Sequence, residues 1–155
     1  MNTSAAHAVR TFEYTREVSG HHAPEAAQEK RRILVVDDDP MIRRFILEAL
    51  GERYRVLAVS NGLELTRLMG EFKPDLVLLD VMMPWIDGLQ LCRTIKTHPD
   101  WTKTPVIFVS GRKSPADVQR GLRQGASAYL TKPFRLVELY EKIGSLLGER
   151  ENELV

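Results

Sequence analysis

Three adjacent aspartates follow a run of apolar residues and are the first residues from which chemistry is expected. The stretch ILVVDDDP places Asp37, Asp38 and Asp39 directly after the apolar residues 33–36. Carboxylates this close repel one another at neutral pH, so either a carboxyl pKa rises or a cation lies nearby. The remaining polar residues of the sequence favour the cation.

Other polar residues also stand where apolar runs end. Asp80 ends DLVLLD, Ser110 ends PVIFVS, and Lys132 follows AYLT. In a doubly wound parallel sheet of order 2-1-3-4-5, ligands bind outside the carboxyl ends of the strands, where the strand order reverses. We therefore expect these three residues to converge with Asp37 and Asp38.

This set of side chains suits magnesium-assisted phosphoryl transfer. Mg²⁺ prefers oxygen ligands and shares its coordination sphere with waters and substrate phosphate, so Asp37 and Asp38 can hold it directly or through water. Asp80 can add one oxygen to the metal and use the other as a nucleophile toward phosphorus. Lys132 and Ser110 can then bind the phosphoryl oxygens.

The elements that must position these residues alternate along the chain. Apolar runs predict strands at residues 33–36, 54–59, 75–79, 105–109 and 127–131. Amphipathic patterns predict helices at residues 40–53, 61–72, 88–98, 115–125 and 135–150. Five such βα units indicate an α/β fold: a doubly wound, five-stranded parallel sheet with helices on both faces.

Local signals support the helix boundaries. Asp39 suits the N-cap of the first helix, with Pro40 as its first residue, and Asp87 is a candidate cap for the third. The first helix carries one apolar stripe, made of Ile42, Phe45, Ile46, Ala49 and Leu50. The lone Cys92 is interpreted as a small core residue.

These residues, in their order along the chain, resemble the receiver domain of two-component response regulators. The resemblance rests on the Asp37-Asp38 pair, Asp80 followed by MMPWIDG, Ser110, and Lys132 in KPF. It extends from about residue 32 to 147, and it implies a flavodoxin-like receiver fold.

The resemblance implies roles that the residues alone do not. Asp80 would be phosphorylated by a sensor histidine kinase or a phosphotransfer protein. Mg²⁺ would contact Asp38, Asp80 and the backbone carbonyl of Met82, with Asp37 acting through water. Trp85 departs from the family, because a small residue, often glycine, is usual there; it could shade the pocket, anchor a partner or pack over the loop.

The resemblance also implies a switch. Ser110 would move toward the phosphoryl group and Tyr129 would change its rotamer with it. The bond between Lys132 and Pro133 would be cis, which a proline at that position permits. Met82 and Arg112 flank the site, where the family tunes hydrolysis of the phosphoryl group.

Composition limits the other partners. The net charge of +1 gives no reason to expect direct binding to nucleic acid or to a membrane, and no apolar run approaches the roughly 20 residues that span a bilayer. The first residues lack the apolar segment of a secretion signal, so we expect a cytoplasmic protein. Its output would be altered binding of a downstream protein, as a monomer or a phosphorylation-dependent dimer. It would not be an enzyme beyond its own phosphorylation and dephosphorylation.

The domain organisation follows from the extent of the pattern. Residues 1–31 are expected to form a flexible or partly helical extension, 32–148 the receiver domain and 149–155 a short tail. So few residues follow the last helix that a stand-alone receiver is expected; a fragment of a longer regulator remains the alternative.

Two other functions would use a similar set of residues. A Mg²⁺-dependent phosphohydrolase of the haloacid dehalogenase type would carry its nucleophile on the first strand, but DDDPM lacks the Thr or Val of that motif. A receiver that binds partners without phosphorylation is disfavoured by the complete set of five residues.

Overall fold

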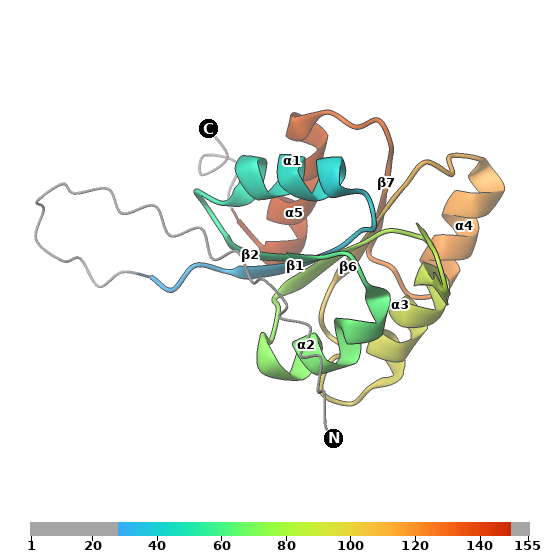
Figure 1. Ribbon diagram of the computed structural model, residues 1–155, viewed down its shortest axis with the longest axis horizontal. Coiled ribbons are helices and arrows are strands. Elements are labelled where there is room, and N and C mark those ends of the chain that lie inside the picture. The colour runs from blue at the N-terminus through green and yellow to red at the C-terminus, as the bar shows by residue number, and fades with distance from the viewer. Residues whose placement is uncertain (1–27, 150–155) are drawn as a thin grey trace, which may run out of the picture.

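The computed structural model describes residues 28–149, and within them strands and helices alternate as the sequence predicts, apart from one short hairpin between the third predicted strand and the third helix (Figure 1). The strands are β1 (Arg32–Val36), β2 (Arg55–Val59), β3 (Leu76–Leu79), β4 (Met82–Met83), β5 (Ile86–Asp87), β6 (Val106–Ser110) and β7 (Ala128–Thr131). The helices are α1 (Pro40–Leu50), the 3-10 turn η1 (Gly62–Glu64), α2 (Leu65–Glu71), α3 (Gly88–Thr97), α4 (Pro115–Arg123) and α5 (Leu136–Leu147). The expectations for residues 1–27 and 150–155 lie outside the described part.

The main sheet confirms the predicted order. Its five strands run β2-β1-β3-β6-β7, and every neighbouring pair is parallel. The strand order reverses at β1 and β3, which are hydrogen-bonded neighbours with Val36 opposite Leu79. The residues that follow these two strands therefore meet at the same edge of the sheet.

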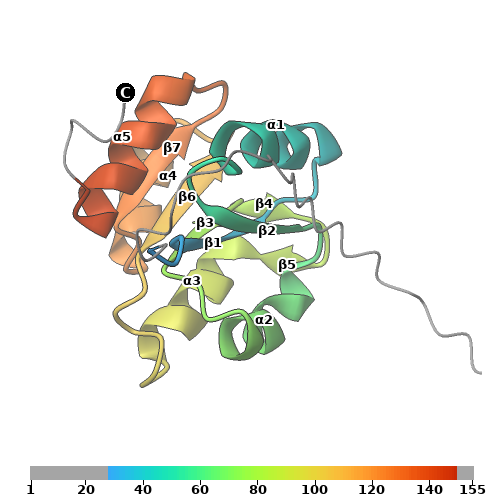
Figure 2. The ribbon, with the colours of Figure 1, turned by 90° about the vertical axis from the view of Figure 1, so that its left-hand side faces the viewer.

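The two faces of the sheet are covered by different helices (Figure 2). Alternate residues of β1 point to opposite sides: Ile33 and Val35 belong to the apolar cluster that includes α1 and α5, whereas Leu34 and Val36 belong to the cluster that includes α2 and α3. This double burial explains why the strands are uninterrupted apolar runs. Cys92 is fully buried in the second cluster, which confirms its interpretation as a core residue.

The apolar stripe of α1 is wider than the face that the sheet buries. Ile46 and Leu50 are buried, but Phe45 is 42% exposed and meets the ring of Phe134 at a centroid distance of 5.9 Å. Phe45 thus lies on the predicted stripe but outside the buried core, because the helical period does not reveal where the stripe leaves the sheet.

Candidate functional site: an acidic cluster and a lysine at the carboxyl edge

The three predicted acids form one cluster. Asp37 and Asp38 follow β1 and Asp80 follows β3, and one carboxylate oxygen from each lies within 4.8 Å of the others. Asp37 and Asp80 are buried, at 2% and 5% exposure, while Asp38 is exposed. Three clustered carboxylates of which one faces solvent are a donor set that fits Mg²⁺, which combines carboxylate oxygens with waters.

The turn that carries the first two acids is held by hydrogen bonds that its backbone N–H groups donate. The N–H of Asp37 donates to the carbonyl of Val59 at 3.1 Å, and the N–H of Asp39 donates to Oδ1 of Asp37 at 2.9 Å. Asp39 itself accepts the N–H of Met41 at 2.9 Å and so caps α1, as predicted. Asp87 caps α3 in the same way through the N–H of Leu89.

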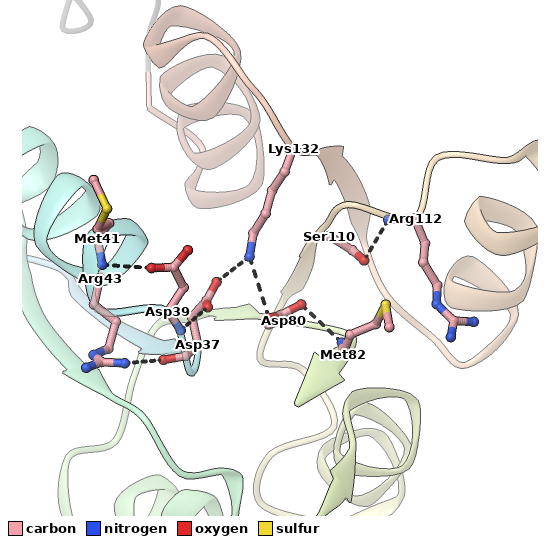
Figure 3. A network of polar contacts seen from close by, with 9 residues as sticks. All are labelled: Asp37, Asp39, Met41, Arg43, Asp80, Met82, Ser110, Arg112 and Lys132. Carbon is pink, nitrogen blue, oxygen red and sulfur yellow. Dashed lines mark hydrogen bonds and ion pairs between the residues drawn. The ribbon is translucent and has the colours of Figure 1, made fainter. Parts of the chain in front are cut away.

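The side chain of Lys132 extends toward the cluster and places its ammonium between Asp37 and Asp80 (Figure 3). It follows β7, and its Nζ lies 2.8 Å from Oδ2 of Asp37 and 3.5 Å from Oδ2 of Asp80. Burial alone would lower the pKa of Lys132, but its hydrogen bond to Asp37 and the negative charges of Asp80 and Asp37 outweigh burial and raise the pKa. Lys132 is therefore charged and offsets part of the repulsion among the acids. Its bond to Pro133 is cis, as the resemblance implied.

Asp80 has the most perturbed acid–base equilibrium of the site. Burial raises the pKa of Asp80 from 3.8 to about 6, and the charge of Asp37 adds to the rise. The N–H of Met82, 3.1 Å from Oδ1 of Asp80, and the ammonium of Lys132 lower the pKa but do not cancel the rise. The ionised carboxylate is thus destabilised in the folded protein when no other cation is present.

Asp80→Asn should therefore stabilise the metal-free protein at alkaline pH. Because the pKa of Asp80 is raised on folding, its unfavourable contribution is complete above about pH 6 and absent below 3.8. We expect a gain of about 2 kcal/mol in the free energy of unfolding at pH 8, and a much smaller gain at pH 4.5. Urea denaturation in EDTA at both pH values measures it. Asp87→Asn, with the same change on an exposed cap, should show no such pH-dependent gain; an equal gain would contradict the assignment.

Ser110 lies near Asp80 in Figure 3, but Ser110 and Tyr129 both bond to Arg112 in the loop after β6. The Oγ of Ser110, which is fully buried, accepts the N–H of Arg112 at 3.2 Å. The hydroxyl of Tyr129 donates to the carbonyl of Arg112 at 2.6 Å. Within residues 28–149 no hydrogen bond joins Ser110 to the acids. The structure therefore brings together the three acids and Lys132, while Ser110 and Tyr129 both hold Arg112.

The loop after Asp80 forms a short hairpin that the sequence analysis did not anticipate. Met82 pairs with Asp87 and Met83 with Ile86, so that Pro84 and Trp85 form the turn. Trp85 has a φ of 70° and is 98% exposed. Of the three possibilities for Trp85, packing over the loop is wrong, because almost none of its surface is covered.

Trp85→Gly should stabilise the protein. A proline at the first central position and a positive φ at the second are features of a type II turn, which favours glycine at the second position. Trp85 gains no burial to offset this cost, so we expect its replacement by glycine to raise the free energy of unfolding by about 1 kcal/mol. Trp101 is half-buried and stacks on His98 at 3.7 Å, so Trp101→Gly should have the opposite sign in the same thermal or urea unfolding. A loss of stability in Trp85→Gly would contradict the turn assignment.

Arg43 is the residue of the site that sequence analysis missed. It lies in the first turns of α1, and its Nη1 donates to the backbone carbonyl of Asp37 at 2.8 Å (Figure 3). A signal was present in the sequence, because helical side chains point back toward the N-terminus of the helix and an arginine here can reach the preceding turn.

None of the helices within residues 28–149 is both long and apolar enough to cross a membrane.

Comparison with known proteins agrees with this geometry. The family described as the response regulator receiver domain matches residues 33–144. The chain is 40% identical over 117 residues to the response regulator MprA of a Mycobacterium species (strain KMS), covering 75% of this chain and 50% of that protein. It is 34% identical over 125 residues to the DNA-binding response regulator MtrA of Mycolicibacterium smegmatis, covering 80% and 54%. The chain thus spans about half the length of the curated relatives it matches.

A solved structure gives the same result. The signal receiver domain of a signal transduction histidine kinase from Syntrophus aciditrophicus superimposes with a TM-score of 0.70 at 38% identity, covering 76% of this chain and 90% of that one. The sheet order, the acidic cluster at the point of strand reversal and the family match therefore agree. The chain belongs to the family of response regulator receiver domains, with the flavodoxin-like fold of that family.

Proposed function

We propose that the chain is a Mg²⁺-dependent phospho-aspartate switch whose phosphorylated residue is Asp80. The observation that carries the proposal is the cluster of three carboxylates within 4.8 Å, facing the ammonium of Lys132 in a receiver domain. The donor would be a sensor histidine kinase or a phosphotransfer protein, since both present a phosphorylated imidazole. The phosphohydrolase alternative is not supported, because its nucleophile would come directly after the first strand in a motif that ends in Thr or Val, whereas DDDPM ends in Met41.

The acids would have two roles: holding the metal ion and attacking phosphorus. Asp37, Asp38, Asp80 and the carbonyl of Met82 would hold Mg²⁺, which when bound offsets charge on the transferred phosphoryl group. Asp80 is oriented for attack by the Met82 N–H on Oδ1 and by Lys132 beside Oδ2. A carboxylate oxygen of Asp80 would form the new bond to phosphorus as the bond from phosphorus to the imidazole nitrogen breaks, leaving the donor histidine neutral once it is protonated.

Lys132 would change partners during the reaction. Its ammonium lies nearest Asp37 at 2.8 Å and only 3.5 Å from Asp80, so it is close enough to contact an oxygen of a phosphoryl group on Asp80. A fixed positive charge directed at the developing negative charge stabilises the transition state more than the ground state. Lys132 would thus pair with the acids before transfer and with the phosphoryl group after it.

The conformational response would pass through Arg112. The Oγ of Ser110 accepts the Arg112 N–H, which leaves the hydroxyl proton of Ser110 free to donate to a phosphoryl oxygen. Movement of Ser110 toward that oxygen would pull on Arg112, whose carbonyl holds the hydroxyl of Tyr129. We propose that Tyr129 changes its rotamer as this bond is lost, which alters the surface offered to a downstream protein.

The switch would occupy most of the chain. The receiver domain would comprise residues 32–148, with 1–31 as an extension and 149–155 as a tail, in the cytoplasm where kinase partners act. MtrA is named as DNA-binding, and the aligned region is 54% of it. For this chain we propose that the receiver signals through protein contacts, whether as a stand-alone protein or as part of a longer regulator.

Phosphorylation from a small donor tests the function directly. The protein incubated with acetyl phosphate and Mg²⁺ should gain the mass of one phosphoryl group, and the gain should be lost in EDTA, because the attack needs the metal to offset charge. Intact-mass spectrometry at several times measures both. Equal labelling with and without EDTA would contradict the metal site, and no labelling under either condition would contradict the switch.

A further inference from the structure

Arg43 contacts the turn after β1, which carries Asp37 and Asp38, at two points. The backbone N–H of Arg43 donates to the carbonyl of Asp39 at 3.1 Å as a first hydrogen bond of α1. Its side chain extends back past the start of the helix, and Nη1 donates to the carbonyl of Asp37 at 2.8 Å (Figure 3). The two carbonyls flank Asp38, the exposed acid of the cluster.

The second bond acts on Asp38 through the peptide plane. The carbonyl of Asp37 and the N–H of Asp38 belong to one rigid peptide unit, so a bond that orients the carbonyl also orients the backbone of Asp38. Within residues 28–149 no hydrogen bond or ion pair involves the side chain of Asp38. Its position relative to Asp37 and Asp80 therefore depends on the backbone of the turn.

Within residues 28–149 the charge of Arg43 takes part in no ion pair. Among the described residues no carboxylate oxygen lies within 4.0 Å of its guanidinium, whereas the neighbouring Arg44 pairs with Glu48 at 3.0 Å. A positive charge near a metal site opposes the binding of a divalent cation. Arg43 can therefore assist metal binding only through the geometry that it imposes.

We propose that Arg43 is a positioning residue for the Mg²⁺ site: its guanidinium orients the peptide between Asp37 and Asp38 so that the exposed carboxylate faces the two buried ones. The inference rests on the proposed function, since it assigns a supporting residue to the same site. Residues that orient ligands from outside the coordination sphere change metal affinity while leaving the ligands in place.

The test is an amide NMR titration with MgCl₂ alone. Arg43→Met keeps the aliphatic stem and a strong helix former but removes every donor, and the dissociation constant for Mg²⁺ should rise about threefold to tenfold. Arg43→Gln, which is neutral and shorter than the arginine, should weaken binding similarly. Arg43→Lys restores a charged donor and should return the constant to within about twofold of the wild type. Arg44→Met is the matched control and should change nothing.

The direction in which the dissociation constant for Mg²⁺ changes distinguishes the positioning role of Arg43 from simple repulsion of the cation by its charge. If Arg43→Met or Arg43→Gln binds Mg²⁺ as tightly as the wild type, or more tightly, the positioning role is wrong and only the repulsion of the cation remains. At saturating Mg²⁺ the rate of labelling by acetyl phosphate should stay near that of the wild type, which separates lost affinity from lost chemistry. Failure of the wild type to bind Mg²⁺ would instead overturn the proposed function.

Discussion

Replacing Asp80 with asparagine should abolish the uptake of a phosphoryl group from acetyl phosphate. The amide retains the size of the carboxylate and can still accept the Met82 N–H, which lies 3.1 Å from Oδ1. It lacks the negative charge and the nucleophilic oxygen that bond formation to phosphorus requires. We therefore expect intact-mass spectra of Asp80→Asn to show no added phosphoryl group under conditions that label the wild type fully.

The control is Asp87, the last residue of the hairpin that follows Asp80. Asp87 is exposed, accepts the N–H of Leu89 and caps α3, a role that asparagine fills equally well. Asp87→Asn should thus label as the wild type does. Loss of labelling in Asp80→Asn cannot be ascribed to unfolding, because this variant is expected to be the more stable protein in the absence of metal. Labelling of Asp80→Asn at the wild-type rate would place the phosphorylated residue elsewhere.

Gly88→Ala should be among the most destabilising single substitutions in the chain. Gly88 begins α3, and a Cβ added there would lie 2.2 Å from the carbonyl oxygen of Asp80 and 2.8 Å from the Cα of Val81. Both are backbone atoms, so no side chain can rotate away to make room. Helix α3 or the segment that carries Asp80 must move, and we expect a loss of about 3 kcal/mol or more in the free energy of unfolding.

Gly70→Ala is the matched comparison. Gly70 lies within α2, and an added Cβ would meet nothing within 4 Å. Alanine should stabilise α2 by about 0.5–1 kcal/mol, because glycine is a poor residue in a helix interior. Urea denaturation of both variants should therefore give changes of opposite sign. A loss below 1 kcal/mol for Gly88→Ala would show that α3 can withdraw from Asp80 at little cost.

The sequence by itself determined the fold and the edge of the sheet at which Asp37, Asp80 and Lys132 lie. Runs such as ILVV and PVIFV predict strands buried on both faces, and the helical patterns between them require parallel neighbours. Parallel strands end at the same edge, so Asp37, Asp80 and Lys132 had to converge once the order was known. The caps at Asp39 and Asp87 were equally predictable, since they depend on a side chain and a backbone only two residues apart.

The tertiary structure decided how the converging residues pair. Lys132 lies 2.8 Å from Asp37 but 3.5 Å from Asp80, and Ser110 bonds to Arg112 rather than to the acids. The two distances of Lys132 differ by less than 1 Å, and the partner of Ser110 depends on the path of the loop after β6. A sequence pattern specifies the strand that a residue follows, but it does not specify distances between strands at this scale.

Arg43 and Trp85 depended on the structure for a different reason. Arg43 lies in a helix with no evident functional signal, and Trp85 was noticed only as an unusual residue type. The structure adds one geometric fact for each: a guanidinium that reaches back to the carbonyl of Asp37, and a φ of 70° at an exposed ring. Hydrophobic periodicity reports which residues are buried and is silent on backbone carbonyls and turn angles. The residue types therefore indicated the chemistry of the acidic cluster. The contacts that support the cluster depend on backbone geometry, which exists only in the folded chain.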